Sequence, residues 1–460
     1  MNRIKSGILA LALTWLCQGM LWNAATARPK SDVKPAQSVR HESAAMVPAG
    51  QGDVIIVWRE VVPQGSDIYA QKLDTDGKQI WGNGGVEICH QSTADAHFSA
   101  VADSQGGVIV VWEDSREGKY NTDIYAQRLD EYGNPVWEND GVPLCTAQHQ
   151  QQFPEAVADQ HGGGFVFWTD YRNGNADIFG CHLNPNGTVV HRFTICTEKD
   201  DQTDLAVAAS NAGSACLVWV DHRYNSPGIY TQLVDRNDSI RWHVDGLPIC
   251  TGVYQQESPA VTSINDSTFL VAWADYRDRL AKVFTQFVDI DGRLLLPLEG
   301  HAVPASVGPQ YSPALCAANS TSGLVTWLQY EKGASMFQQR IDIDRRVEMT
   351  TSVGISKPSL AQFWPNSVAD GSGGSFTVWV EYDGGKIEIF GQHTGPDSRL
   401  KWGRTGLLLG SAREKSHPQI VFDRMHHALF VAWTSNSTEG SRITVSGVTE
   451  GGIIKWKKEL

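Results

Sequence analysis

The chain has 460 residues and carries 38 Lys and Arg against 51 Asp and Glu, a formal net charge of −13. An acidic surface argues against a nucleic-acid backbone or an anionic membrane as partner, so we expect neither. Sixteen Trp and 44 Gly, with few long segments of helical periodicity, favour an all-β protein.

The first 27 residues have the features of a secretory signal peptide. Arg3 and Lys5 precede an apolar run, and Ala25 to Ala27 provide the small residues that a signal peptidase recognises. The alternative is a membrane anchor, but Thr14 and Gln18 interrupt the run. No later stretch approaches the roughly 20 apolar residues of a spanning helix. We therefore expect an exported protein, periplasmic or extracellular, with no membrane insertion after cleavage.

The rest of the chain is a repeat marked by tryptophan. Eight short apolar runs each end in a Trp, at intervals of just over fifty residues: Trp58, Trp112, Trp168, Trp219, Trp273, Trp327, Trp379 and Trp433. A fixed period of this length indicates a repeat architecture. A residue that recurs in every unit is usually part of the scaffold, so we interpret these Trp side chains as core, with sugar-stacking platforms as the alternative.

The second unit shows four strand-like segments, A to D. Segment A is Ser99 to Ala102, and segment B is Val108 to Trp112, rich in β-branched residues. Segment C is Ile124 to Leu129, and segment D lies near Val136 and Trp137, with the residues through Cys145 extending it or crossing to the next unit. Four short antiparallel strands in each of many units are typical of a β-propeller.

We therefore predict one β-propeller domain over residues 45–460, with eight four-stranded blades. Seven blades is the alternative count, and a pair of β-sandwiches is the alternative fold, although sandwiches do not explain eight units in phase. Residues 28–44 are predicted to complete the last blade, because closing the ring removes exposed sheet edges. Cys89, Cys145, Cys196 and Cys250 occupy one slot of successive units and are interpreted as small buried hydrophobes.

The turns between segments C and D are rich in Asp, Asn and Gly, residues suited to tight hairpins. Asp74 to Gly77 and Asp289 to Gly292 both read DxDG. That pattern resembles part of a calcium loop, but the distant bidentate Glu is absent. The sequence predicts no cofactor and leaves calcium as a possibility.

Four successive units carry Trp-x-Asp-x-Arg directly after segment B. The charged residues of this motif are Asp114 and Arg116, Asp170 and Arg172, Asp221 and Arg223, and Asp275 and Arg277. One interpretation is an Asp–Arg pair that pins the B–C loop or bridges blades, since the planar guanidinium suits bidentate pairing. The other is a site for an anion or carboxylate.

The B–C loops and D–A connections share one face of the predicted disc, and they are longer and more varied than the turns of the other face. Binding residues usually lie on such loops. We predict the ligand or partner site on this face, from the Asp/Arg residues together with His149, Tyr254 and Trp364.

The unit resembles the repeats of exported bacterial proteins that are taken to be β-propellers. The resemblance is carried best by Trp112 to Trp137 and Trp168 to Gly187, and it fades in the last three units. It implies the fold rather than an activity.

Catalytic motifs such as GxSxG or HExxH do not occur in a fitting context. The sequence therefore favours a monomeric, non-catalytic binding or scaffold protein, with a protein or a glycan as partner. The alternative is a propeller hydrolase or lyase acting on glycans, which would need carboxylates converging in the central channel.

Overall fold

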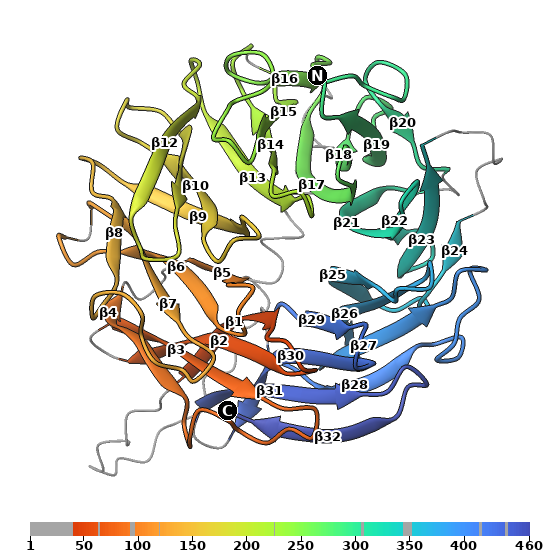
Figure 1. Cartoon of the computed structure of the whole chain (residues 1–460). Coiled ribbons are helices and arrows are strands. Elements are labelled where there is room, and N and C mark those ends of the chain that lie inside the picture. Colours follow the sequence, from red (N-terminus) through yellow and green to blue (C-terminus); the bar gives the residue numbers. More distant parts are fainter. Residues whose placement is uncertain are drawn as a thin grey trace, which may run out of the picture. The chain divides into compact units, whose positions relative to one another are not determined.

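The computed structural model describes residues 40–62, 65–92, 97–118, 120–224, 226–304, 308–343, 352–413, 416–437 and 440–460. They form an all-β structure of eight four-stranded antiparallel blades around a central axis (Figure 1). No helix that could span a membrane occurs in these ranges. The predicted signal peptide, residues 1–27, lies outside them.

Each blade uses its four strands in chain order from the axis outward (Figure 1). The inner strands are β1 (Arg40–Pro48), β5 (Phe98–Ala102), β9 (Gln151–Ala158), β13 (Gln202–Ala209), β17 (Gln256–Asn265), β21 (Gln310–Asn319), β25 (Ala361–Ala369) and β29 (Gln419–Asp423). The second strands are β2 (Val54–Val62), β6 (Val108–Asp114), β10 (Gly164–Asp170), β14 (Ala215–Asp221), β18 (Thr268–Asp275), β22 (Ser322–Tyr330), β26 (Ser375–Asp383) and β30 (Ala428–Ser437).

The outer half of each blade is more variable in length. The third strands are β3 (Gly65–Leu73), β7 (Asp123–Leu129), β11 (Asp177–Leu183), β15 (Gly228–Val234), β19 (Lys282–Asp289), β23 (Ala334–Asp342), β27 (Lys386–Thr394) and β31 (Gly440–Val448). The fourth strands are β4 (Val86–Ser92), β8 (Val142–Cys145), β12 (Val189–Cys196), β16 (Leu247–Cys250), β20 (His301–Ala302), β24 (Val353–Gly354), β28 (Leu407–Ser411) and β32 (Ile454–Glu459).

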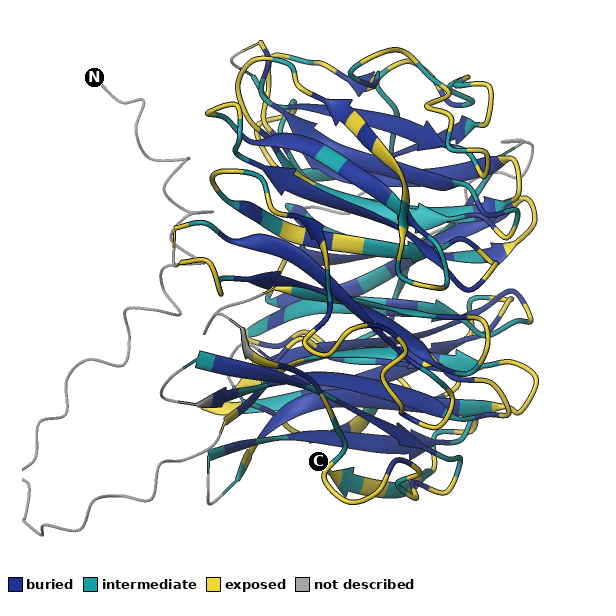
Figure 2. Ribbon diagram, turned by 60° about the vertical axis from the view of Figure 1, so that its left-hand side comes forward, coloured by how far each residue is buried: buried dark blue, intermediate teal, exposed yellow. Residues whose placement is uncertain are grey.

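The core lies between neighbouring blades, where the second strands are buried along most of their length (Figure 2). All eight repeat tryptophans at the ends of the second segments are at most 2% exposed. The interpretation of these residues as scaffold is therefore confirmed. The seven cysteines of the described residues are buried and free, as expected for small hydrophobes in the core.

The fourth strand does not lie at Val136 and Trp137, as predicted, but in the residues through Cys145 that were expected to extend it or to cross to the next unit. In the second blade it is β8, and the residues around Trp137 form a crossover in which only Pro135 makes an isolated bridge to Leu129. Trp137 instead packs toward the next blade, where its indole N–H donates to the carbonyl of Pro185 at 3.1 Å. Sequence periodicity could not separate these two uses of an aromatic residue.

Eight inner strands contact one another in chain order, and β29 returns to β1. The last blade takes its outer strand, β32, from the C-terminal unit itself. Trp456 on this strand donates its indole N–H to the carbonyl of Thr75 in the first blade, at 2.8 Å.

The predicted closing segment, residues 28–44, lies largely outside the described residues. Its described part, residues 40–44, belongs to β1 of the first blade, so the propeller begins before the predicted boundary at residue 45. Arg40 also pairs in parallel with Ser441 of β31, which joins the first and last blades in one sheet.

Candidate ligand site at the channel mouth

The Trp-x-Asp-x-Arg motif forms a closed hydrogen-bonded cluster within each blade. In the second blade the indole N–H of Trp112 donates to Asp114 at 2.9 Å, and the Arg116 guanidinium donates to both oxygens of the same carboxylate. Burial alone would raise the pKa of Asp114, but the hydrogen bonds from Arg116 and Trp112 outweigh it and lower the pKa. The carboxylate is thus ionised, and both of its oxygens accept hydrogen bonds.

The same cluster recurs in the next three blades and reaches the preceding blade. Each Arg stacks 3.9–4.2 Å from the centroid of an aromatic ring on the third strand: Tyr125, Phe179, Tyr230 and Phe284. Each Asp also lies 3.6–4.0 Å from the thiol of the preceding blade: Cys89, Cys145, Cys196 and Cys250. The geometry therefore explains the motif as a device that pins the B–C loop and links neighbouring blades.

The structure does not bring these charged residues together as one site. The four carboxylates, of Asp114, Asp170, Asp221 and Asp275, are at most 1% exposed. Each of their four partners, Arg116, Arg172, Arg223 and Arg277, donates its Nε–H and one terminal N–H to the carboxylate. Their role in binding stays a prediction.

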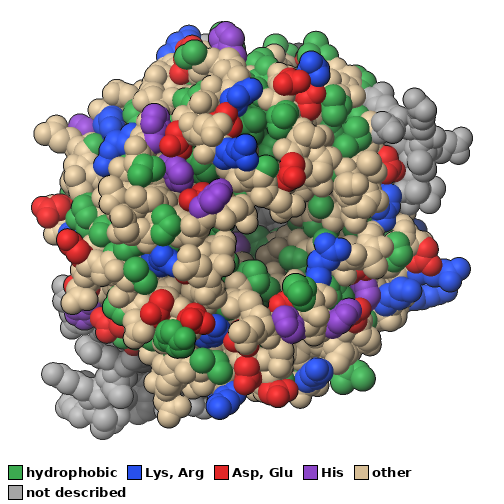
Figure 3. All heavy atoms as spheres, viewed as in Figure 1, with side chains coloured by type: hydrophobic (Ala, Val, Ile, Leu, Met, Phe, Trp, Pro, Cys, Tyr) green, Lys and Arg blue, Asp and Glu red, His purple; other side chains and the backbone are tan. Residues whose placement is uncertain are grey.

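A ring of eight residues surrounds the channel at the start of the inner strands. We call it the mouth ring: Ser43, His97, Phe153, Asp204, Ser258, Ser312, Trp364 and His417. The inner strands begin beside the ends of the second strands, so the mouth ring lies on the predicted face of B–C and D–A loops. Figure 3 shows that the face of the molecule seen there is hollowed at the centre of the ring of blades.

A β-bulge gives the mouth ring its geometry. In six blades the bulged residue has a left-handed backbone with φ between 49° and 55°: Ser43, Phe153, Asp204, Ser258, Ser312 and Trp364. Non-glycine residues adopt this conformation at a cost, and bulges redirect side chains. The carboxylate of Glu113, in the second blade, accepts the backbone N–H of Phe153 at 2.7 Å and holds this bulge in place.

Two aromatic pairs stand in the mouth ring, each formed across a blade boundary. Trp364 and His417 stack with ring centroids 4.2 Å apart, and His97 and Phe153 lie 4.6 Å apart in a tilted arrangement. Burial lowers the pKa of His417, so this imidazole is neutral at neutral pH. The mouth therefore offers two flat aromatic surfaces, and the carboxylate of Asp204 lies on the inner strand next to that of Phe153.

One step deeper, the channel is lined mostly by small or uncharged residues. The equivalent positions are Ala45, Ser99, Glu155, Ala206, Ala260, Ala314, Asn366 and Gln419. Glu155 is the exception: its side chain reaches the channel, yet the blades around it shield it from bulk water and raise its pKa to about 7. The Ser99 hydroxyl of the neighbouring blade hydrogen-bonds this carboxyl group.

The three other predicted site residues lie at different places. Trp364 belongs to the mouth ring, whereas His149 and Tyr254 are exposed on D–A connections. Sequence reasoning did not single out Phe153 and Glu155. The signal that could have found Glu155 is a charged residue at a position that is Ala or Ser in most units.

The DxDG turns use their first carboxylate locally. Asp74 accepts the backbone N–H groups of Asp76 and Lys78, and Asp289 does the same for Asp291 and Arg293. Among the described residues no three His, Cys, Asp or Glu side chains form a group that could hold a metal. Calcium at these turns stays a prediction.

No family model and no curated protein sequence matches this chain. Among solved structures it is similar to a eukaryotic initiation factor, with a TM-score of 0.47 and 10% identity over 92% of this chain and 89% of that one. It is also similar to a protein of unknown function from Dyadobacter fermentans, with a TM-score of 0.40 and 9% identity over 65% and 95% of the two chains. An α-L-arabinanase from Penicillium chrysogenum has a TM-score of 0.39 and 11% identity over 65% and 93%. None of these similarities reaches a level at which an activity can be transferred.

Proposed function

We propose that this chain is an exported binding protein that takes a glycan at the mouth of its central channel. The observation that carries this proposal is the pair of aromatic contacts, Trp364 with His417 and Phe153 with His97, in a ring otherwise made of small polar residues. Sugar rings present apolar C–H faces that stack on aromatic rings, and their hydroxyl groups seek carboxylates and hydroxyls at the edge.

The scaffold supports such a site because the side chains are held in place before a ligand arrives. The left-handed backbone at Phe153 and Trp364 and the hydrogen bond from Phe153 to Glu113 fix two of the aromatic side chains on β9 and β25. A preorganised surface loses less conformational entropy on binding than a flexible one.

The test is calorimetric titration of the full chain with neutral tetrasaccharides of glucose, xylose, arabinose and N-acetylglucosamine. We expect binding of at least one, weakened about tenfold or more by Trp364→Ala or Phe153→Ala. Tyr132→Ala is the matched control, because Tyr132 is an aromatic residue that is 72% exposed on the C–D turn of the other face. Equal loss in all three variants, or no binding by the wild type, overturns the proposal.

A second candidate is a glycan hydrolase, and a specific observation favours it. A carboxyl group with a pKa near 7 is still partly protonated at neutral pH and can serve as a general acid, which is the state of Glu155 in the channel. Asp204 on the neighbouring inner strand is an exposed carboxylate in the same mouth. A hydrolase of this kind releases sugar from the panel above, and Glu155→Gln abolishes release while binding persists.

A further inference from the structure

The third blade differs from five of the others in how it covers its repeat Trp. In five blades the crossover before the fourth strand places a left-handed glycine against the edge of that indole, as Gly141 does in the second blade with φ of 82°. A Cβ at Gly141 would lie 2.3 Å from the Trp112 ring, so the crossover covers that ring closely. The other such glycines are Gly85, Gly246, Gly300 and Gly406.

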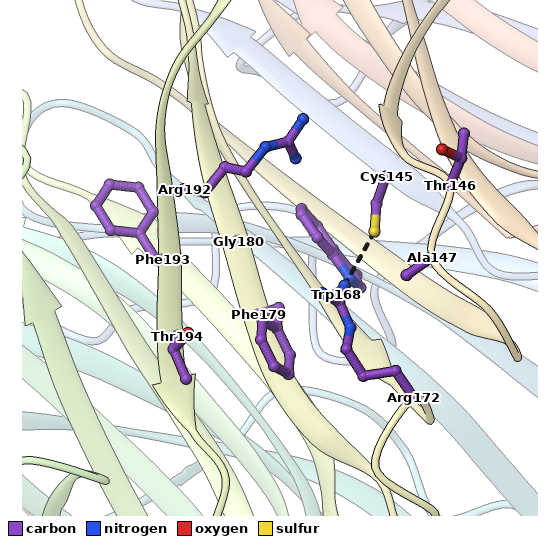
Figure 4. A pocket seen from close by; sticks show the side chains of 10 residues that line it. All are labelled: Cys145, Thr146, Ala147, Trp168, Arg172, Phe179, Gly180, Arg192, Phe193 and Thr194. Atoms are coloured by element: carbon purple, nitrogen blue, oxygen red, sulfur yellow. Dashed lines mark hydrogen bonds between the residues drawn. The ribbon is translucent and has the colours of Figure 1, made fainter.

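In the third blade this cover is missing. Its chain runs from the turn at Asn184–Gly187 almost directly into β12, which pairs along β11 up to the position opposite Ile178. The space beside Trp168 is left as a cavity of about 340 Å³ (Figure 4). Phe179 forms an apolar wall, and Arg172 and Arg192 line the cavity together with the thiol of Cys145. Only the backbone side of Phe193 borders the cavity, because its ring packs against Phe165 and Phe167 on the other face of the sheet.

The missing crossover also leaves an arginine with spare donors. In the second, fourth and fifth blades the Arg of the motif donates to a crossover carbonyl, of Asp140, Asp245 and Glu299 respectively, at 2.6–3.0 Å. Arg172 has no such carbonyl among the described residues, and its donors go to Asp170 and Cys145 alone.

A second guanidinium near the cavity also has hydrogen-bond donors to spare. Arg192, exposed on β12, donates one N–H to the carbonyl of Leu144 across the blade boundary, and its remaining donors have no partner in the described part of the chain. The residues that line the cavity include both arginines and no Asp or Glu. Asp170 compensates the charge of Arg172, so Arg192 gives the cavity its net positive charge in a chain with a net charge of −13.

We infer that this cavity between the second and third blades binds a small organic anion with a flat apolar body, an aromatic carboxylate. The ring lies beside Trp168 and Phe179, and the carboxylate takes the place of the missing crossover carbonyl against Arg172 and Arg192. Arginine suits this role because its fork of donors matches a carboxylate. The site is separate from the channel mouth and independent of the proposed function.

Benzoate is the probe, with benzamide as the uncharged isostere and acetate as an anion without the ring. We expect benzoate to bind the full chain in a calorimetric titration at least tenfold more tightly than either control compound. Arg192→Leu should weaken benzoate binding about tenfold, as expected for the loss of a charge-assisted contact.

Arg424→Leu is the matched control variant, because Arg424 is also exposed and also donates to one carbonyl of a neighbouring blade, that of Gly371. This variant should bind benzoate like the wild type. Equal affinity for benzoate and benzamide, unchanged affinity in Arg192→Leu, or no benzoate binding by the wild type overturns the inference.

Discussion

At the scale of single residues, the buried charged side chains that recur in the repeat stabilise the fold. Asp170 accepts hydrogen bonds from the indole of Trp168 and from the Arg172 backbone and guanidinium, and it lies next to the thiol of Cys145. Removing one partner of a buried ion pair leaves the other charge without compensation. The motif is therefore a junction on which two blades depend.

The first prediction follows from this junction. Asp170→Ala should lower the free energy of unfolding by about 3–5 kcal/mol, because Arg172 and the indole lose their common acceptor. Chemical denaturation measures the loss. Asp76→Ala, on an exposed turn, is the control and should change stability by less than about 0.5 kcal/mol. Similar small effects of both variants would contradict the structural role of the motif.

Asp123 is also a buried carboxyl group, but unlike Asp170 it lacks compensating partners among the described residues. It is fully buried, neither of its oxygens has a hydrogen-bond partner among the residues that the structure describes, and burial raises its pKa to about 6. Its folded-state pKa thus lies above the unfolded value near 4, so the folded state binds more protons between these values. The contribution of protonated Asp123 to the free energy of unfolding, present in full below pH 4, is lost as the pH rises through 6.

The second prediction is a pH-dependent gain in Asp123→Asn. The variant should exceed the wild type by about 2 kcal/mol at pH 7 and by much less at pH 4, where the carboxyl group is protonated in the folded state and about half ionised in the unfolded state. Denaturation at a series of pH values measures this difference. A gain that does not change between pH 4 and pH 7 would show that the charge of Asp123 is not its source.

At the scale of strands and connections, the crossover Trp is the recurring contact between blades. Trp81, Trp137, Trp242 and Trp402 each donate an indole N–H to a turn carbonyl of the next blade, and Trp456 repeats this contact from the last blade to the first. The closing boundary of the ring is therefore built from the same contact as the internal ones.

The third prediction tests that equivalence. Trp456→Phe and Trp402→Phe each keep an aromatic ring and lose one hydrogen bond, so each should lower the free energy of unfolding by about 1 kcal/mol. Denaturation of the two variants in parallel gives the comparison. A loss in Trp402→Phe with none in Trp456→Phe would mean that the ring is not closed by this strand.

The elements also show where sequence reasoning succeeds. The spacing of Trp58 to Trp433 predicts eight blades and their second strands, because each blade buries one large ring at the same place. The same reasoning misplaces the fourth strand, since Trp137 serves the next blade rather than its own sheet. Of the mouth ring it names Trp364 but not Phe153, because a left-handed bulge leaves no mark in a hydrophobic pattern.

At the scale of the whole molecule, the repeat separates scaffold from site. Residues that recur are buried between blades, whereas the deviations Glu155, Phe153 and Trp364 gather around the channel. The cavity of the third blade is a deviation of another kind, produced by a shortened connection. Function in a propeller of this type lies where the units differ.

The central claim is that a glycan binds at the channel mouth, and hydrogen–deuterium exchange with a saturating tetrasaccharide tests it most directly. We expect slower exchange in residues 153–156 of β9 and 363–366 of β25, and no change in the C–D turns at residues 130–134 and 184–187 on the other face. Protection confined to those turns, with none on β9 or β25, would contradict the claim.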